Sequence, residues 1–282
     1  DCVNFQKINF ALKRMLQSLM NGESGYFGVL STFYEIMDIS TALSPLNNIQ
    51  RVKKIIDESE NIVFFGGAGV STESGIPDFR SVDGLYNQKY KYPPEVMVSH
   101  SFYRSHTEEF FEFYKIKMIA MEAKPNAAHC KLAKLEAEGK VKAVITQNID
   151  GLHQAAGSNE VLELHGSVHR NFCERCGKFH SVEHVIQAKD IPICECGGIV
   201  KPDVVLYEES LDYETMQKTK RYIQEADLLI IGGTSLAVYP AAGFVDYFRG
   251  KYLVVVNMDD TAKSVRADLI IRERIGEVFE LI

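Results

Sequence analysis

The sequence lacks any apolar run of the roughly 18 residues that a transmembrane helix needs, and no basic start leads into an apolar signal core. We therefore expect a cytoplasmic protein without a membrane span, while numbering from Asp1 leaves a processed start open. Internal repeats, low-complexity tracts and a basic excess are also missing: 31 Lys and Arg face 38 Asp and Glu, a net charge of -7. This balance argues against strong nucleic-acid binding and mildly favours cationic substrates.

Five short apolar stretches are typical of buried strands, and each runs into polar or glycine-rich residues. They are 62–65, 141–145, 161–164, 227–231 and 253–256. In open α/β sheets, ligands bind at such strand ends. A chain of 282 residues, 46% apolar and 24% charged, is long enough for one large α/β domain with an appended module. The sequence predicts that fold class.

The loop after the first predicted strand carries part of a dinucleotide motif. Gly67-Ala68-Gly69 supplies the first two glycines of G-x-G-x-x-G, but Thr72 occupies the third position. An ordinary dehydrogenase also requires an acidic residue at the end of a second strand, about 20 residues later, and this chain has none there. Taken alone, the loop is equally typical of a nucleotide cradle and of a plain tight turn.

Four of the six cysteines form two close pairs. They are Cys173, Cys176, Cys194 and Cys196. Four thiolates at this spacing favour one structural zinc ion with no position open for water. The second pair is one residue tighter than C-x-x-C, and Gly197-Gly198 after it lets N–H groups turn toward sulfur. Reduced thiol pairs, or two disulfides in a secreted protein, are the alternatives.

Several motifs in register resemble the sirtuins, the NAD-dependent protein lysine deacylases. They are 67–71, 75–81, Thr146 to His153, His165-Gly166, 233–235 and the four cysteines. The resemblance runs from about residue 47 to the C-terminus. It implies a Rossmann-like parallel-sheet domain over 47–84, 125–168 and 203–282, with a smaller inserted part. That part comprises a helical module and cofactor loop at 85–124 and a zinc-binding module at 169–202.

The resemblance also implies the roles of the polar strand ends, with NAD as co-substrate. His165 would be the base for a ribose hydroxyl, although a histidine at a strand end can also be a simple cap. Gln147 would bind ribose, and Asn148 and Asp150 would orient nicotinamide and serve catalysis with His165. The implied NAD contacts are Gly67, Ala68, Gly69, Thr72, Asp78, Phe79, Arg80, Gln147, Asn148, Asp150, Gly233, Thr234, Ser235, Asn257 and Asp259.

Acylated-lysine proteins or peptides are the implied substrates. The implied substrate contacts are Val205, Leu206, Tyr207 and Glu209, beside which a peptide would lie as an added strand. Glu208 stands where the family usually has glycine. Sirtuins that prefer acidic acyl groups carry an arginine soon after the phenylalanine-arginine motif, and here none lies between Arg80 and Arg104. We therefore expect neutral acyl groups, acetyl first.

Residues 1–46 match nothing in the family pattern. Apolar residues at helical spacing predict an amphipathic helical pair there, which would pack on its own domain or offer a partner or membrane surface. The aromatic residues between 81 and 124 favour helices packed in a core. Two other functions stay open: NAD-consuming ADP-ribosyl transfer or glycohydrolysis on the same fold, and a zinc module that only senses nucleotide.

Overall fold

A computed structural model of the chain describes residues 45–78, 91–259, 261 and 266–282. The chain divides into Asp1–Asn48 and Ile49–Ile282, and the second unit carries the features below. Of the segment 1–46, in which a helical pair is expected, residues 1–44 lie outside the described residues, as do Phe79 and Arg80. Within the described part, no helix is both long and apolar enough to cross a membrane.

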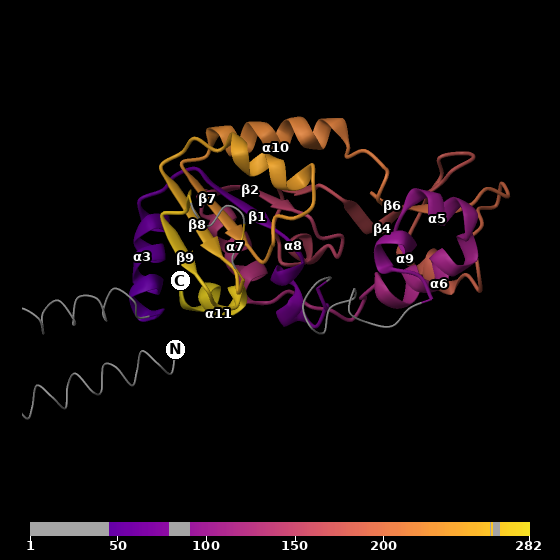
Figure 1. Ribbon diagram of the computed structural model, residues 1–282, viewed down its shortest axis with the longest axis horizontal. Coiled ribbons are helices and arrows are strands. Elements are labelled where there is room, and N and C mark those ends of the chain that lie inside the picture. The colour runs from indigo at the N-terminus through magenta and orange to yellow at the C-terminus, as the bar shows by residue number, and fades with distance from the viewer. Residues whose placement is uncertain (1–44, 79–90, 260, 262–265) are drawn as a thin grey trace, which may run out of the picture. The chain divides into compact units, whose positions relative to one another are not determined.

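The large domain is built on a six-stranded parallel sheet in the order β3-β2-β1-β7-β8-β9 (Figure 1). Its strands are β1 (Ile62–Gly66), β2 (Val141–Thr146), β3 (Val161–Glu163), β7 (Leu228–Gly232), β8 (Tyr252–Val256) and β9 (Leu269–Ile271). All five predicted strands are confirmed, as is the Rossmann-like fold class. The sixth strand, β9, was not predicted.

Both faces of this sheet are covered, which explains why its strands are almost continuously apolar. Alternate residues point to opposite faces, so Phe64 belongs to one core and Phe65 to the other. The first core is closed by α3 (Pro45–Asp57), α7 (Ala127–Ala137) and α11 (Ile275–Leu281). The second is closed by α10 (Tyr213–Glu225) and η4 (Ala241–Tyr247), and Figure 1 shows α10 above the sheet.

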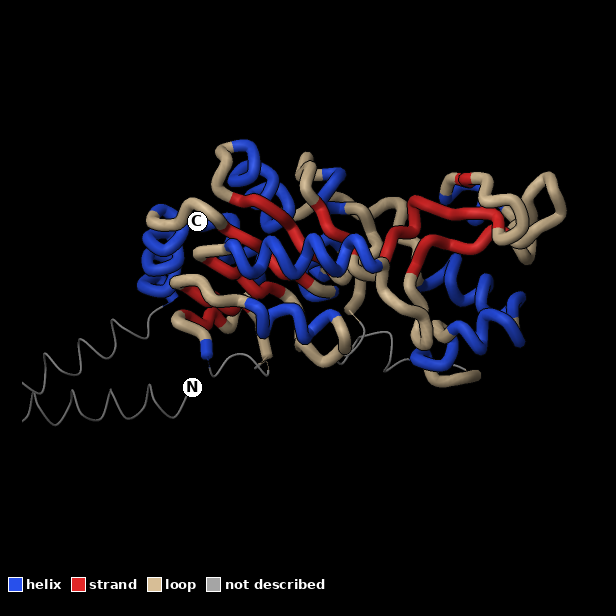
Figure 2. Tube along the Cα trace, turned by 90° about the horizontal axis from the view of Figure 1, so that it is seen from above, coloured by secondary structure: helices blue, strands red, loops and turns tan. Residues whose placement is uncertain are grey.

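A smaller body, here called the small module, joins an antiparallel sheet to several helices (Figure 2). Its strands are β4 (Gly166–Cys173), β5 (Phe179–His180) and β6 (Val200–Val204), and its helices are α4 (Pro94–Met97), α5 (His100–Ser105), α6 (Thr107–Lys117) and α9 (Val182–Gln187). The aromatic residues of α5 and α6 are buried in one core with Cys173 and Cys194. The helical and cysteine-bearing segments therefore fold together.

Candidate active site

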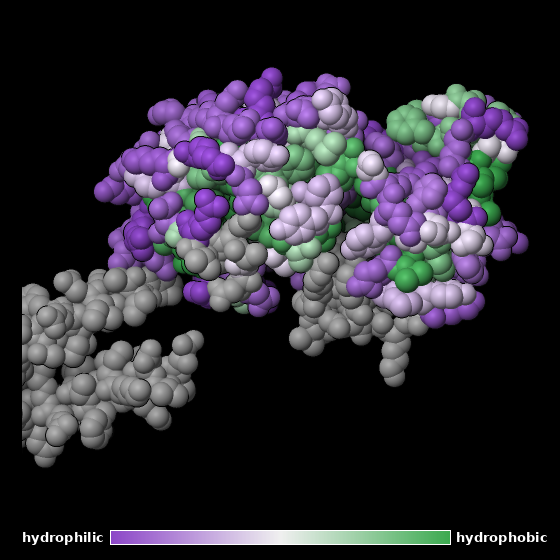
Figure 3. All heavy atoms as spheres, turned by 45° about the horizontal axis from the view of Figure 1, so that its top comes forward, coloured by the Kyte–Doolittle hydropathy of each residue, from purple (hydrophilic) through white to green (hydrophobic). Residues whose placement is uncertain are grey.

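A cavity of about 440 Å³ opens at the carboxyl ends of the parallel strands. It lies where β1 neighbours β7, the point at which successive connections leave in opposite directions and ligands bind in such sheets. Every site residue expected from the sequence lines it, apart from the cysteines and from Phe79 and Arg80, which are outside the described residues. Figure 3 shows hydrophobic residues gathered beside the hollow between the large domain and the small module.

The glycine loop packs directly on the loop that follows β7. The Gly69 N–H donates to the Gly233 carbonyl at 2.8 Å, and the Gly67 N–H donates to that of Gly232 at 3.2 Å. Gly233 has a φ of 56°, and a Cβ there would lie 2.4 Å from the Val70 nitrogen. Only glycine fits this approach. A polyphosphate in the cavity would therefore meet N–H groups other than those of Gly67 and Gly69.

Ser71 holds the two polar groups expected to orient nicotinamide. Its hydroxyl donates to Oδ2 of Asp150 at 2.7 Å and accepts from Nδ2 of Asn148 at 3.0 Å. Ser71 is buried, and the second Asp150 oxygen accepts from the Leu152 N–H at 2.9 Å. The Asn148 amide and the Asp150 carboxylate are therefore held in fixed orientations without a ligand. Ser71 is not among the predicted site residues, although a short hydroxyl side chain beside the glycine loop was an available signal.

His165 is oriented by the backbone of the neighbouring strand end. Its Nδ1 lies 2.9 Å from the carbonyl oxygen of Gln147. Because a carbonyl can only accept, Nδ1 carries the proton of the neutral ring and Nε2 is left as an acceptor. Burial lowers the pKa of His165 below its usual 6.5, against the opposing effect of the bond to Gln147. The ring is therefore a neutral base at physiological pH.

Gln147 itself is tied to the opposite wall of the cavity. Its Nε2 donates to Oγ1 of Thr234 at 3.0 Å, and its backbone N–H donates to the Gly66 carbonyl at 3.0 Å. Thr234 is buried, and its Oγ1 also accepts from the Leu236 N–H at 3.2 Å. These bonds cross from β2 to β7 over β1, so they fix the amide in the centre of the site.

The segment expected to bind the substrate already has most of its N–H groups engaged. The Val205 N–H donates to the His165 carbonyl, and the Tyr207 N–H donates to that of Val98, both at 3.0 Å. The Leu206 N–H donates to a carboxylate oxygen of Glu209 at 3.0 Å. A peptide beside this segment must form hydrogen bonds with the segment's remaining backbone groups. Contacts to the peptide's side chains therefore contribute a larger share of recognition.

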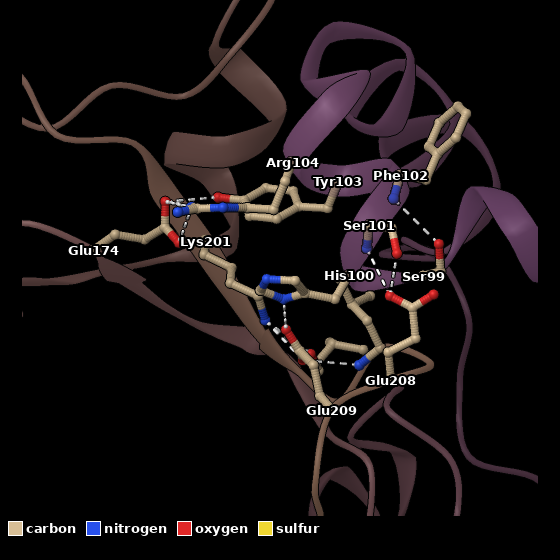
Figure 4. A network of polar contacts seen from close by, with 12 residues as sticks. Ser99, His100, Ser101, Phe102, Tyr103, Arg104, Glu174, Lys201, Glu208 and Glu209 are labelled. Atoms are coloured by element: carbon tan, nitrogen blue, oxygen red, sulfur yellow. Dashed lines mark hydrogen bonds and ion pairs between the residues drawn. The ribbon is translucent and has the colours of Figure 1, made fainter.

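Glu209 ties this segment to the small module (Figure 4). One carboxylate oxygen lies 2.8 Å from His100 Nδ1, and the other lies 3.2 Å from Lys201 Nζ. Burial raises the pKa of Glu209, but the bonds from His100, the Leu206 N–H and Lys201 outweigh burial and lower the pKa. Glu209 is therefore ionised and lies inside a network, so its expected role in substrate contact includes holding the segment in place.

The four cysteines converge as the sequence predicted. Their sulfur atoms all lie within 4.8 Å of one another, with Cys173 and Cys196 at 3.3 Å and Cys176 and Cys194 at 3.8 Å. A tetrahedral zinc ion with bonds of about 2.3 Å separates its sulfur ligands by about 3.8 Å. A Cβ on Gly198 would lie 2.6 Å from the Cys173 sulfur, so the turn after the second pair needs glycine to pass close to the first pair. The donor set fits one structural zinc ion, outside the cavity.

Comparison with known proteins agrees with this geometry. Residues 67–240 match the Sir2 family. A Clostridium acetobutylicum protein named NAD-dependent protein deacetylase is 60% identical over 241 residues, 84% of this chain and 98% of that protein. A protein of the same name from Cutibacterium acnes is 52% identical over 229 residues, 80% of this chain and 94% of that protein.

Solved structures show the same similarity. A Sir2 variant with a deacetylated p53 peptide and 3'-O-acetyl ADP ribose superposes with a TM-score of 0.77 at 39% identity, covering 83% of this chain and 96% of that one. A structure of Sir2Tm bound to a propionylated peptide gives a TM-score of 0.74 at 38% identity, covering 82% and 95%.

Proposed function

This chain belongs to the Sir2 family, and from that premise we propose that it removes acetyl groups from protein lysines in a reaction that consumes NAD. The products are nicotinamide and an O-acyl-ADP-ribose. The observation that carries the proposal is the neutral His165, whose Nε2 is free to accept a proton in the same cavity as the Ser71-held pair Asn148 and Asp150.

The polar groups at the strand ends have distinct roles in this reaction. The Asn148 amide and the Asp150 carboxylate bind the nicotinamide carboxamide, and Ser71 keeps both in position. Gln147 bonds to the ribose hydroxyls, and His165 Nε2 takes a proton from the hydroxyl that attacks the acyl carbon. The wall formed by Gly233 to Ser235 with Asn257 and Asp259 receives phosphate and adenosine. The zinc ion would stabilise the small module and take no part in the chemistry.

The substrate class follows from the segment Val205 to Tyr207 in the cavity wall. Val205 and Tyr207 flank the acyl-lysine stem, and the peptide lies along the same segment. Neutral acyl groups are preferred, acetyl first, since the sequence between Arg80 and Arg104 offers no arginine to an acidic acyl group. We also propose a cytoplasmic location, because the four cysteines of the zinc donor set and the exposed Cys130 form no disulfide among the described residues, which suits a reducing compartment.

The test is to incubate the protein with NAD and matched acetyl-lysine and succinyl-lysine peptides, and to identify the products by mass spectrometry. Nicotinamide, deacetylated peptide and O-acetyl-ADP-ribose are expected, with the acetyl peptide turned over faster. His165→Ala should lower kcat by about 10²–10⁴-fold. NAD should still shift its melting temperature, which would show a folded site. Free ADP-ribose or ADP-ribosylated protein as the main product would instead support glycohydrolysis or ADP-ribosyl transfer, and full turnover in the variant would exclude His165 as the base.

A further inference from the structure

Glu208 has a backbone conformation that normally belongs to glycine. Its φ is 76°, in the left-handed region that a side chain disfavours. One carboxylate oxygen accepts from the Ser101 N–H at 2.9 Å and from the Ser101 hydroxyl (Figure 4). These bonds at the start of α5 offset the cost of the conformation and fix the direction of the carboxylate at the edge of the cavity.

The carboxylate of Glu208 is charged and exposed, and within the described part of the chain it has no ion pair. The Ser101 hydroxyl and N–H bonds hold its pKa below the usual range. Among the described residues, no lysine or arginine forms an ion pair with it, whereas the neighbouring Glu209 is paired with Lys201 and His100. Glu208 lines the cavity beside Tyr207. It is therefore a fixed negative charge facing the space where a substrate lies.

The surroundings of Glu208 favour recognition through charge. The N–H groups of Val205, Leu206 and Tyr207 are already engaged within the protein. A peptide beside them loses those main-chain donors, so contacts to its side chains contribute a larger share of the binding free energy. A partly exposed ion pair at such an edge alters affinity modestly and alters selectivity between peptides more clearly.

We propose that Glu208 is a specificity-determining residue that favours acyl-lysine substrates with an arginine or lysine close to the acyl-lysine. Glu208 lies three residues beyond Val205, which at about 3.3 Å per extended residue is at most about 10 Å along the segment. The cation therefore belongs within about three positions of the acyl-lysine. This inference rests on the proposed deacylase function and names the substrates of the same site.

The experiment scans one arginine through positions -3 to +3 of an alanine-flanked acetyl-lysine peptide. Turnover of the parent peptide with NAD, detected as O-acetyl-ADP-ribose, tests the deacylase function by itself. The arginine-to-alanine ratio of kcat/KM then tests the inference. We expect one or two positions to raise the ratio roughly two- to fivefold, mainly through KM, and a glutamate there to lower it. This preference should shrink in 1 M salt, where the screening length falls to about 3 Å.

Glu208→Gln keeps an acceptor for Ser101 and removes the charge, so the ratio should fall close to one. Glu208→Gly removes both the charge and the bonds to Ser101, and it should give the same ratio as Glu208→Gln. Glu112→Gln is the matched control, since Glu112 is exposed on α6, does not line the cavity, and should keep the wild-type ratio. A flat arginine scan in a wild-type enzyme that turns over the parent peptide would overturn the inference, as would an unchanged ratio in Glu208→Gln.

Discussion

Two histidines behind the cavity are buried without charge. His129 and His153 are at most 1% exposed, and their ring centroids lie 4.6 Å apart. Neither nitrogen of His153 has a hydrogen-bond partner among the described residues. Burial lowers the pKa of His153 to about 3 and that of His129 to about 4. For His153 the nearby His129 adds to the effect, whereas for His129 the Asp150 charge opposes it.

The pair should make the protein less stable in acid. Below pH 6.5 these histidines are protonated in the unfolded chain but stay neutral in the folded protein. The free energy of unfolding therefore falls as the pH drops from 6.5 toward 4. One such histidine contributes a loss of about 2 kcal/mol between pH 7 and pH 5. His153→Phe removes one titrating group and suits the contact with Phe64. Denaturant unfolding of this variant at both pH values should show a smaller loss than the wild type, and an equal loss would contradict this account.

Among single residues, the sequence predicted the site residues that directly follow strands, but it did not predict the residues that hold those side chains in place. Gln147, Asn148, Asp150 and His165 stand in dense polar motifs at strand ends, and all line the cavity. The hydrogen bonds of Ser71 to Asn148 and Asp150 join positions 77 and 79 residues apart, which no local pattern encodes. The left-handed backbone at Glu208 does not follow from its own residue type, because glycine is the usual signal for it, and only the family's usual glycine at this position pointed to it.

Among the elements, the parallel strands were predictable and the small antiparallel sheet was not. Strands buried on both faces appear as apolar runs, whereas β5 has only two residues and β4 mixes buried and exposed residues without a regular alternation. The small module is also discontinuous in sequence: α5 and α6 share a core with β4 and β6, which lie some 60 to 100 residues later along the chain. Residue patterns predicted these pieces separately, and only the resemblance to the sirtuins put them in one smaller part.

The zinc ion should hold this module together. The purified protein should contain about one zinc ion per chain, and Cys194→Ser should lose it, because three thiolates and a hydroxyl bind zinc less tightly. Cys194 is buried in the same core as Phe110 and Val200, so hydrogen exchange in α5, α6 and β6 should rise while the large sheet stays protected. Metal analysis and exchange mass spectrometry provide the measurements. Cys130→Ser, at an exposed free cysteine, is the control and should keep the metal.

At the scale of the whole molecule, the large domain and the small module are joined where β3 leads into β4. Arg170 on β4 lies between Glu163, at the end of β3, and Asp203 on β6. Its Nη1 lies 2.5 Å from a Glu163 oxygen and its Nε lies 2.7 Å from an Asp203 oxygen. The Glu163 side chain is only 7% exposed, so its charge depends on Arg170 for a partner. This ion pair fixes the junction beside His165.

Removing Arg170 should therefore lower the free energy of unfolding by more than the loss of a surface ion pair would. Arg170→Ala leaves the buried Glu163 charge without its partner, and we expect a loss of about 1–3 kcal/mol in the free energy of unfolding, measured by denaturant titration. The double variant Arg170→Ala with Glu163→Gln should recover part of this loss, because the neutral amide needs no counter-charge. Arg249→Ala, which removes only bonds to nearby exposed carbonyls, is the control and should cost less than about 0.5 kcal/mol. Equal stability of the single and double variants would show that the junction does not depend on this charge pair.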